Sequence, residues 1–122
     1  MNKDQALHNF WSSFGLVAYD EQTVPTGATA PYITYEVATD RLDEPVSLTA
    51  SIWWRSMSWV EINQVRDAIA LRLSNGGQII KLDDGYLWIT QGSPFSQRMD
   101  EPSDDAIRRI ILNVQAEFLT AA

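Results

Sequence analysis

The stretch VSLTASIWWRSMSWVEINQVRDAIALRLSNGG, residues 46–77, decides the fold because its apolar repeat changes from a period of two to a helical period. The first part alternates apolar and polar side chains, which is typical of a half-buried strand over 46–55. The apolar positions of this strand are Leu48, Ala50, Ile52 and Trp54. In the second part, apolar side chains recur at Ile62, Val65, Ile69 and Leu73. This spacing predicts a helix over 59–74.

Polar and glycine residues mark both ends of this helix. Ser58 and Glu61 have the spacing of a capping box, in which each side chain accepts a hydrogen bond from the other residue's backbone N–H. Asn75-Gly76-Gly77 follows the last apolar position, and these residue types tolerate the left-handed backbone that ends many helices. We therefore expect the helix to begin beside Ser58 and to end before Asn75.

The residues before this stretch predict another strand and another helix. From Tyr32 to Val37 the apolar side chains again alternate, so we expect this segment to pair with 46–55 as an antiparallel hairpin. Residues 2–14 carry a helical apolar stripe made of Leu7, Phe10, Trp11 and Phe14. A short strand is expected over 16–19.

The residues after the stretch predict a hairpin and one further element. In residues 78–90, Asp83-Asp84-Gly85 separates two apolar runs, which is a strong turn signal. Residues 106–119 fit both a helical stripe and one face of a strand, and their β-branched content favours the strand. Residues 20–31 and 91–105 have no periodicity and are predicted to be flexible loops.

This order of elements predicts the fold class. Helix, strands, helix and strands follow one another without repeats or low-complexity segments. We therefore expect a single α+β domain over 1–122, with a mostly antiparallel β-sheet and two helices packed on one face of it.

Composition excludes several classes of protein. The chain has 122 residues, a formal net charge of −7 and no cysteine. Without cysteine there is no disulfide framework, zinc finger, iron–sulfur site or thiol nucleophile. The negative charge argues against a broad grip on DNA phosphates. No segment has the character of a membrane span or a secretory signal, so we expect a soluble protein made in a cytoplasm.

Residues for catalysis are few. His8 is the only histidine, so a serine–histidine–aspartate triad would depend on a residue that we expect on a helix surface. Glu36 and Glu117 fall on predicted strands, where we expect them to face water or a neighbouring subunit. The acidic pairs in turns lack the ligand spacing of a calcium loop; they are Asp83-Asp84, Asp100-Glu101 and Asp104-Asp105. We therefore expect no enzyme activity, no cofactor and no metal site.

Five tryptophans in so short a chain indicate a role beyond packing. Trp11 and Trp54 fall on core faces, whereas strand alternation turns Trp53 outward together with Arg55. A loop or a second layer over Trp53 is the alternative. Exposed tryptophan beside arginine is typical of interface hot spots. The predicted interface residues are Trp53, Arg55, Trp59 and the doublet Arg108-Arg109. We expect the doublet to pair with acidic residues, either within the chain or across an interface.

Two short segments and the order of the elements resemble a known family. The segments are Ala18-Tyr19-Asp20 and Ala30-Pro31-Tyr32-Ile33-Thr34-Tyr35. Together with the closing RRIILNVQAEF of residues 108–118, they are similar to the tail terminator and tail-completion proteins of long-tailed bacteriophages and prophages. Members of this family are small α+β proteins of about this length.

The resemblance implies a structural role in a virion. Such proteins form a ring, usually a hexamer, on the head-proximal end of the tail tube, where they stop tube polymerisation and present a surface for head joining. The implied partners are further copies of the chain, the major tail tube protein and the head–tail connector. DNA would pass through the central hole without specific binding. The implied location is the virion tail, after synthesis in the bacterial host cytoplasm.

Properties of the residues are compatible with this role. An acidic wall repels DNA phosphates and lets a duplex slide. A ring needs two different surfaces that meet head to tail, and the predicted interface residues and acidic loops could supply them. Neck, head-completion and minor tail proteins are alternatives within the same class. A small peptide- or ligand-binding module, with aromatic side chains lining a groove, is the alternative from a different class.

Overall fold

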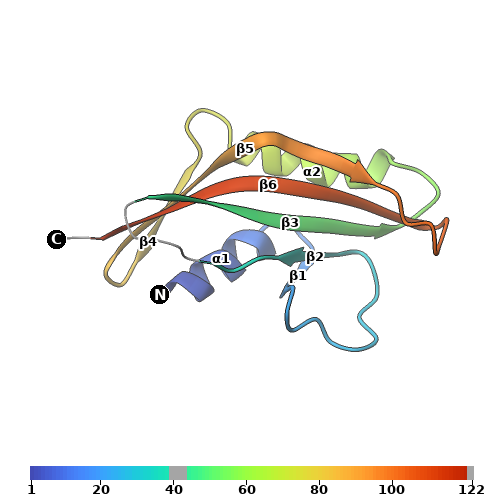
Figure 1. Ribbon diagram of the computed structural model, residues 1–122, viewed down its shortest axis with the longest axis horizontal. Helices are drawn as coiled ribbons and strands as arrows, with labels where there is room; N and C mark the ends of the chain where they lie inside the picture. The colour runs from blue at the N-terminus through green and yellow to red at the C-terminus, as the bar shows by residue number, and fades with distance from the viewer. Residues whose placement is uncertain (39–43, 121–122) are drawn as a thin grey trace.

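The computed structural model describes residues 1–38 and 44–120, which form one six-stranded sheet and two helices (Figure 1). The strands lie in the order β1-β2-β3-β6-β5-β4. In chain order the elements are α1 (Lys3–Ser12), β1 (Val17–Asp20), β2 (Tyr32–Tyr35), β3 (Pro45–Arg55), α2 (Val60–Arg72), β4 (Gln78–Leu82), β5 (Gly85–Met99) and β6 (Ile107–Thr120). The expected α+β class is therefore confirmed.

The sheet is mostly antiparallel, as predicted. Strands β2 and β3 pair antiparallel, and so do β3 with β6, β6 with β5, and β5 with β4. Only β1 and β2 run parallel among the described strands. The three longest strands, β3, β6 and β5, lie side by side in the middle of the sheet.

The C-terminal segment is a strand, which confirms the favoured of its two predicted states. Its position explains the choice, because β6 is hydrogen-bonded to β3 along one side and to β5 along the other. Its alternate residues from Ile110 to Phe118 are buried. A helix would bury a different set of side chains and would leave the backbone groups of both neighbouring strands without partners.

The prediction of a loop over 91–105 is wrong for its first part. Strand β5 continues to Met99 after a register shift between Gln91 and Ser96. Residues 92–95, called below the arch, lie tightly on β6. A Cβ atom on Gly92 would come within 2.8 Å of the Asn113 carbonyl oxygen, and the Asn113 amide donates to the Pro94 carbonyl over 2.9 Å. The connection between β5 and β6 is therefore only residues 100–106. In contrast, the loop predicted over 20–31 contains no helix or strand except at Asp20, which is the last residue of β1.

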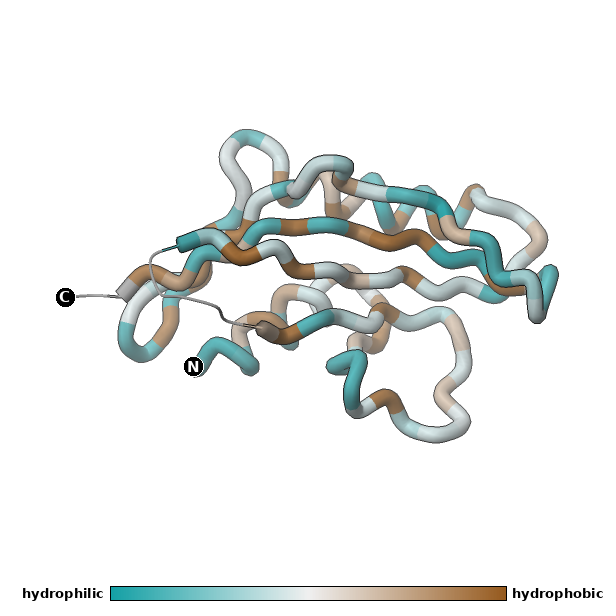
Figure 2. The backbone as a smooth tube through the Cα atoms, viewed as in Figure 1, coloured by the Kyte–Doolittle hydropathy of each residue, from teal (hydrophilic) through white to brown (hydrophobic). Residues whose placement is uncertain are grey.

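The core joins both helices to alternate residues of the strands. Leu7, Phe10 and Trp11 of α1 and Ile62 and Ile69 of α2 belong to one buried cluster with the side chains of the sheet. Trp11 is only 1% exposed, and Trp54 packs partly buried against the same cluster, which confirms both predicted core positions. Figure 2 shows the hydrophobic residues concentrated in the middle of β6, whereas the turn between β5 and β6 is hydrophilic.

The ends of the helices differ from the predicted pattern at one point. The capping box of Ser58 and Glu61 is wrong, because Trp59 is the N-cap of α2 and its side chain makes no capping hydrogen bond. The Ser58 hydroxyl instead accepts from the backbone N–H of Val60 over 3.1 Å, a local turn that competes with a capping box. The predicted end is correct: Asn75-Gly76-Gly77 has φ of 57°, 95° and 86°.

The chain start is tied to the hairpin between β4 and β5. The N-terminal amine and the Asp83 carboxylate form an ion pair, and the Asp83 N–H donates to the Met1 carbonyl over 3.0 Å. Within the described part of the chain, neither helix is both long and apolar enough to cross a membrane.

Candidate functional site

The five predicted interface residues lie at one end of the β3–β6 pair, Trp53, Arg55 and Arg109 on one face and Trp59 and Arg108 on the other. Trp53 is the Cα partner of Arg109, and Arg55 lies two residues further along β3, opposite Ile107. Helix α2 starts five residues after β3 ends, which returns Trp59 to the same end. The structure thus gathers Trp53, Arg55, Trp59, Arg108 and Arg109, called below the Arg–Trp cluster.

Trp53 points away from the core, as alternation predicts, but it is only half-exposed. Its ring stacks on Tyr32 with the ring centroids 6.2 Å apart, and the Arg109 guanidinium lies 4.4 Å from its centroid. The indole N–H donates to the Thr34 hydroxyl over 3.0 Å. Tyr19 extends this row with an edge contact to Tyr32. Contacts within the chain therefore hold this row of rings in place. The row of Tyr19, Tyr32 and Trp53 is called below the ridge.

Trp59 is likewise covered by arginine. The Arg98 guanidinium lies 4.6 Å from the centroid of its ring, and that of Arg108 lies 5.4 Å from it. Contacts of this kind contribute about 0.5–1 kcal/mol each at exposed sites. Arg98 was missed in the sequence because it falls in the segment predicted to be a loop.

Arg108 holds the chain at this end instead of pairing with an acid. Its guanidinium donates to the carbonyl oxygens of Asp105 (2.6 Å), Met57 (2.8 Å) and Ile107 (3.2 Å). These bonds tie the start of β6 to the segment that enters α2. The side chain therefore fixes the position of Trp59 relative to the sheet.

The other two arginines pair with acids of the connection between β5 and β6. Arg55 contacts the Asp104 carboxylate at 3.2 Å, and Arg109 contacts that of Glu101 at 3.7 Å. The pKa of the Asp104 carboxyl is lowered, mainly because it accepts a hydrogen bond from the Ala106 backbone N–H and further because of Arg55. Within the described residues, Arg109 makes the expected pair with an acid of the same chain, whereas Arg108 binds carbonyl oxygens.

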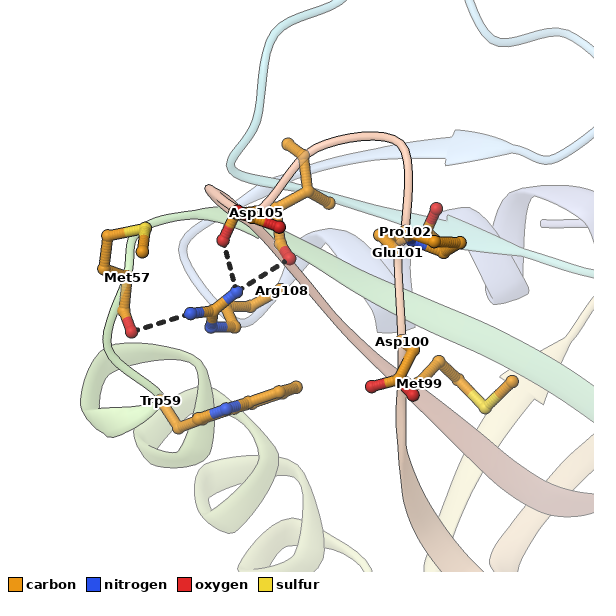
Figure 3. Close-up of a pocket in the computed structure, with 9 residues that line it drawn as sticks. Met57, Trp59, Met99, Asp100, Glu101, Pro102, Asp105 and Arg108 are labelled. Carbon is orange, nitrogen blue, oxygen red and sulfur yellow. Dashed lines mark hydrogen bonds between the residues drawn. The ribbon is translucent and has the colours of Figure 1, made fainter.

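A cavity of about 390 Å³ opens beside Trp59 (Figure 3). In Figure 3, the Arg108 guanidinium lies above the indole of Trp59, with Asp100 and Asp105 at the rim. The residues that line it are Met57, Trp59, Met99, Asp100, Glu101, Pro102, Asp105, Ile107 and Arg108, and it is called below the Trp59 cavity. Its lining is mixed, because three of these side chains are carboxylates, one is the Arg108 guanidinium and the others are apolar.

The only histidine of the sequence, His8, lies beside two hydroxyl groups. The Nδ1 atom of His8 lies 3.1 Å from the Tyr35 hydroxyl, and its Nε2 atom lies 3.4 Å from that of Ser12. Burial raises the pKa of Tyr35, and the carboxylates of Asp20 and Asp4 raise it further. Within residues 1–38 and 44–120, no three histidine, aspartate or glutamate side chains form a group that could hold a metal ion.

A second surface was not predicted. Ile79, Tyr86 and Trp88 are exposed on the hairpin of β4 and β5, with 64%, 44% and 37% of their surface accessible. The signal was present, because these residues alternate with buried Leu87 and Ile89 on the same hairpin. The alternation along β5 would have shown which side chains face outward, once β5 had been paired with β6.

Comparisons of the chain with protein-family models, with curated proteins and with solved structures each found no match.

Proposed function

We propose that this chain is a structural phage assembly protein, a tail terminator or tail-completion protein that forms a ring on the head-proximal end of the tail tube. One observation carries the proposal: the aromatic and arginine residues expected at an interface gather at one end of the sheet. Their rings and guanidinium groups are held by contacts within the chain. A pre-ordered surface loses less side-chain entropy when a partner binds.

We infer further that both helices pack on one face of the sheet. This inference rests on the single buried cluster that their apolar side chains share with the alternate residues of the strands. The row Tyr32–Trp53–Arg109 alternates with those buried residues, so it belongs to the other face. A face without helices leaves a broad surface for neighbouring subunits.

A ring, which we expect to be a hexamer, requires each copy to present two different surfaces. The Arg–Trp cluster is one of them in this proposal. The ring would end the polymerisation of the major tail tube protein and would offer its other side to the head–tail connector. The net charge of −7 suits a ring through which DNA passes without being held. The protein would act by assembly rather than by catalysis, in the tail of the virion.

Tube assembly in the presence of the protein tests the proposal. Tail tube protein is polymerised with and without the purified chain, and tube lengths and ends are examined by electron microscopy. We expect shorter tubes with a ring at one end. Tubes of unchanged length with bare ends contradict the proposal. Binding to the connector alone favours the neck or head-completion alternative.

The Trp59 cavity favours a second candidate function, a small peptide- or ligand-binding module. Its apolar side chains and rim carboxylates have the mixed character of ligand sites. Tryptophan fluorescence separates the two functions. In a ligand-binding module, the emission responds to added peptide at low protein concentration, whereas in an assembly protein it responds to the concentration of the protein itself.

A further inference from the structure

An exposed apolar patch lies at the end of the sheet formed by β4 and the start of β5. Ile79 is the Cα partner of Trp88, and Lys81 is the partner of Tyr86, so the four side chains form two neighbouring cross-strand pairs on one face. These residues, Ile79, Lys81, Tyr86 and Trp88, are called below the Trp88 patch. Large apolar side chains gathered and exposed in this way indicate a surface that a protein partner covers.

The patch is ordered before any partner binds. The Trp88 indole N–H donates to the Gly76 carbonyl over 2.7 Å, which fixes the orientation of the ring. The left-handed backbone of Gly77 brings this turn against β5, where a Cβ atom would collide with the Ile89 carbonyl oxygen. Lys81 is exposed, and among the described residues its ammonium has no ion pair or hydrogen bond.

The Trp59 cavity has the complementary composition. Its rim carboxylates of Asp100 and Asp105 have no cation partner in the described part of the chain, since Arg108 binds the carbonyl oxygen of Asp105 and not its side chain. Met57 is 69% exposed beside them. The cavity therefore offers apolar contact and two carboxylates without a cation partner, next to the Arg108 guanidinium. The Trp88 patch offers apolar contact and the free Lys81 ammonium, next to Glu117, which lies beside Trp88 on the same face.

The two surfaces lie at opposite ends of the hairpin of β5 and β6 (Figure 1). Tyr86 pairs with Leu119 at one end of the hairpin and Met99 pairs with Arg109 at the other. Along β6 the step from Arg109 to Leu119 separates these pairs by about 33 Å. One copy cannot bring its own two surfaces together, but two copies can meet head to tail.

We propose that the Trp88 patch of one copy docks on the Trp59 cavity of the next copy, with the Lys81 ammonium facing the carboxylates of Asp100 and Asp105. The contact is heterologous, so its repetition gives a closed ring when the rotation between copies closes. The proposal rests on the proposed function and adds to it the two surfaces that meet.

A charge-swap experiment tests the contact, with association of the full chain measured by mass photometry and sedimentation over a concentration series. Lys81→Glu places like charges across the contact and is expected to weaken association about tenfold, as is Asp105→Lys. The double variant K81E/D105K restores association. An equimolar mixture of the two single variants also restores it, because the patch of K81E then meets the cavity of D105K.

Two variants on α2 provide charge-matched controls. Arg66→Glu and Asp67→Lys change the charge by the same amounts on a helix outside both surfaces, and they are expected to leave association unchanged. The proposal is overturned if the wild-type chain stays monomeric, if the single swaps associate normally, or if the double variant is not restored. If the chain caps tail tubes but the charge swaps do not change its association, the proposed function stands and only this contact is overturned.

Discussion

The two ends of the β5–β6 hairpin use tryptophan in opposite ways. At one end, Trp53 and Trp59 are half-buried beneath arginine guanidinium groups that are held by acids or carbonyl oxygens of the same chain. At the other end, Trp88 is exposed and is fixed by one hydrogen bond to Gly76. The covered rings are therefore fixed by several contacts of their own chain and also stabilise the fold, whereas Trp88 contributes little to the fold and keeps its exposed surface for a partner.

The largest expected effect on stability is that of Arg108→Ala. The substitution removes three hydrogen bonds from a charged group, and we expect the free energy of unfolding to fall by about 3 kcal/mol. Urea unfolding followed by circular dichroism measures the change. Arg108→Lys is the control, because an ammonium keeps the charge but cannot reach three carbonyl groups in the same geometry. An unchanged unfolding midpoint in Arg108→Ala would show that this arginine does not stabilise the fold.

Trp53→Ala is expected to cost less, about 2 kcal/mol. It removes the stacking on Tyr32, the contact with Arg109 and the hydrogen bond to Thr34. The same unfolding measurement applies. Trp53→Phe, which keeps an aromatic ring without the indole N–H, should lie between the wild type and Trp53→Ala. If Trp53→Ala is neutral, the ridge does not stabilise the fold.

Trp88→Ala is expected to lower the free energy of unfolding by less than about 1 kcal/mol, because the side chain is exposed and makes a single hydrogen bond. Its effect should appear in self-association instead, as a shift of the monomer population to higher protein concentration in mass photometry. If Trp88→Ala greatly lowers the free energy of unfolding and leaves association normal, Trp88 stabilises the fold and does not contact a partner.

The smallest expected effect is on the pH dependence of stability. The folded-state pKa of Asp104 is lowered from its ordinary 3.8, so its contribution is present above that value and is lost as the pH falls through the folded pKa. Asp104→Asn should therefore lower the melting temperature slightly at neutral pH, and the difference from the wild type should shrink below pH 3.8. A difference that stays constant down to the lowest pH measured argues against a role for this carboxylate.

Much of the fold could be predicted from local patterns. The alternation around Ile52, the helical repeat around Ile69 and the Asp-Gly turn at Gly85 each report an element that its own residues define. The strand over 107–120 was harder, because a run such as Ile110-Ile111-Leu112 suits both states. Pairing with a strand on each side settled it, and one of these strands, β3, is distant in sequence.

The missed features depend on contacts that no local pattern reports. Gly92 and Pro94 interrupt the alternation of β5, but the strand continues because it pairs again with β6 from Ser96 onward, and the Asn113 side chain donates to the Pro94 carbonyl between the two parts. Arg98 was missed for the same reason, because it lies in the part of β5 that follows the arch. The sequence did predict the members of the Arg–Trp cluster, but it could not show that Arg108 would bind carbonyl oxygens rather than acids.

The arch in β5 also reverses which face of the sheet the even-numbered residues of this strand lie on. Before it, Trp88 pairs with Glu117 and even-numbered residues face away from the core; after it, Arg98 pairs with buried Ile110 and lies over Trp59. Without the reversal, Arg98 would stand on the face that carries Trp53. The number of residues in the arch, more than their identity, thus decides which tryptophan receives this arginine. Inserting or deleting one residue there would transfer a positive charge from one side of the sheet to the other without altering any residue of the Arg–Trp cluster.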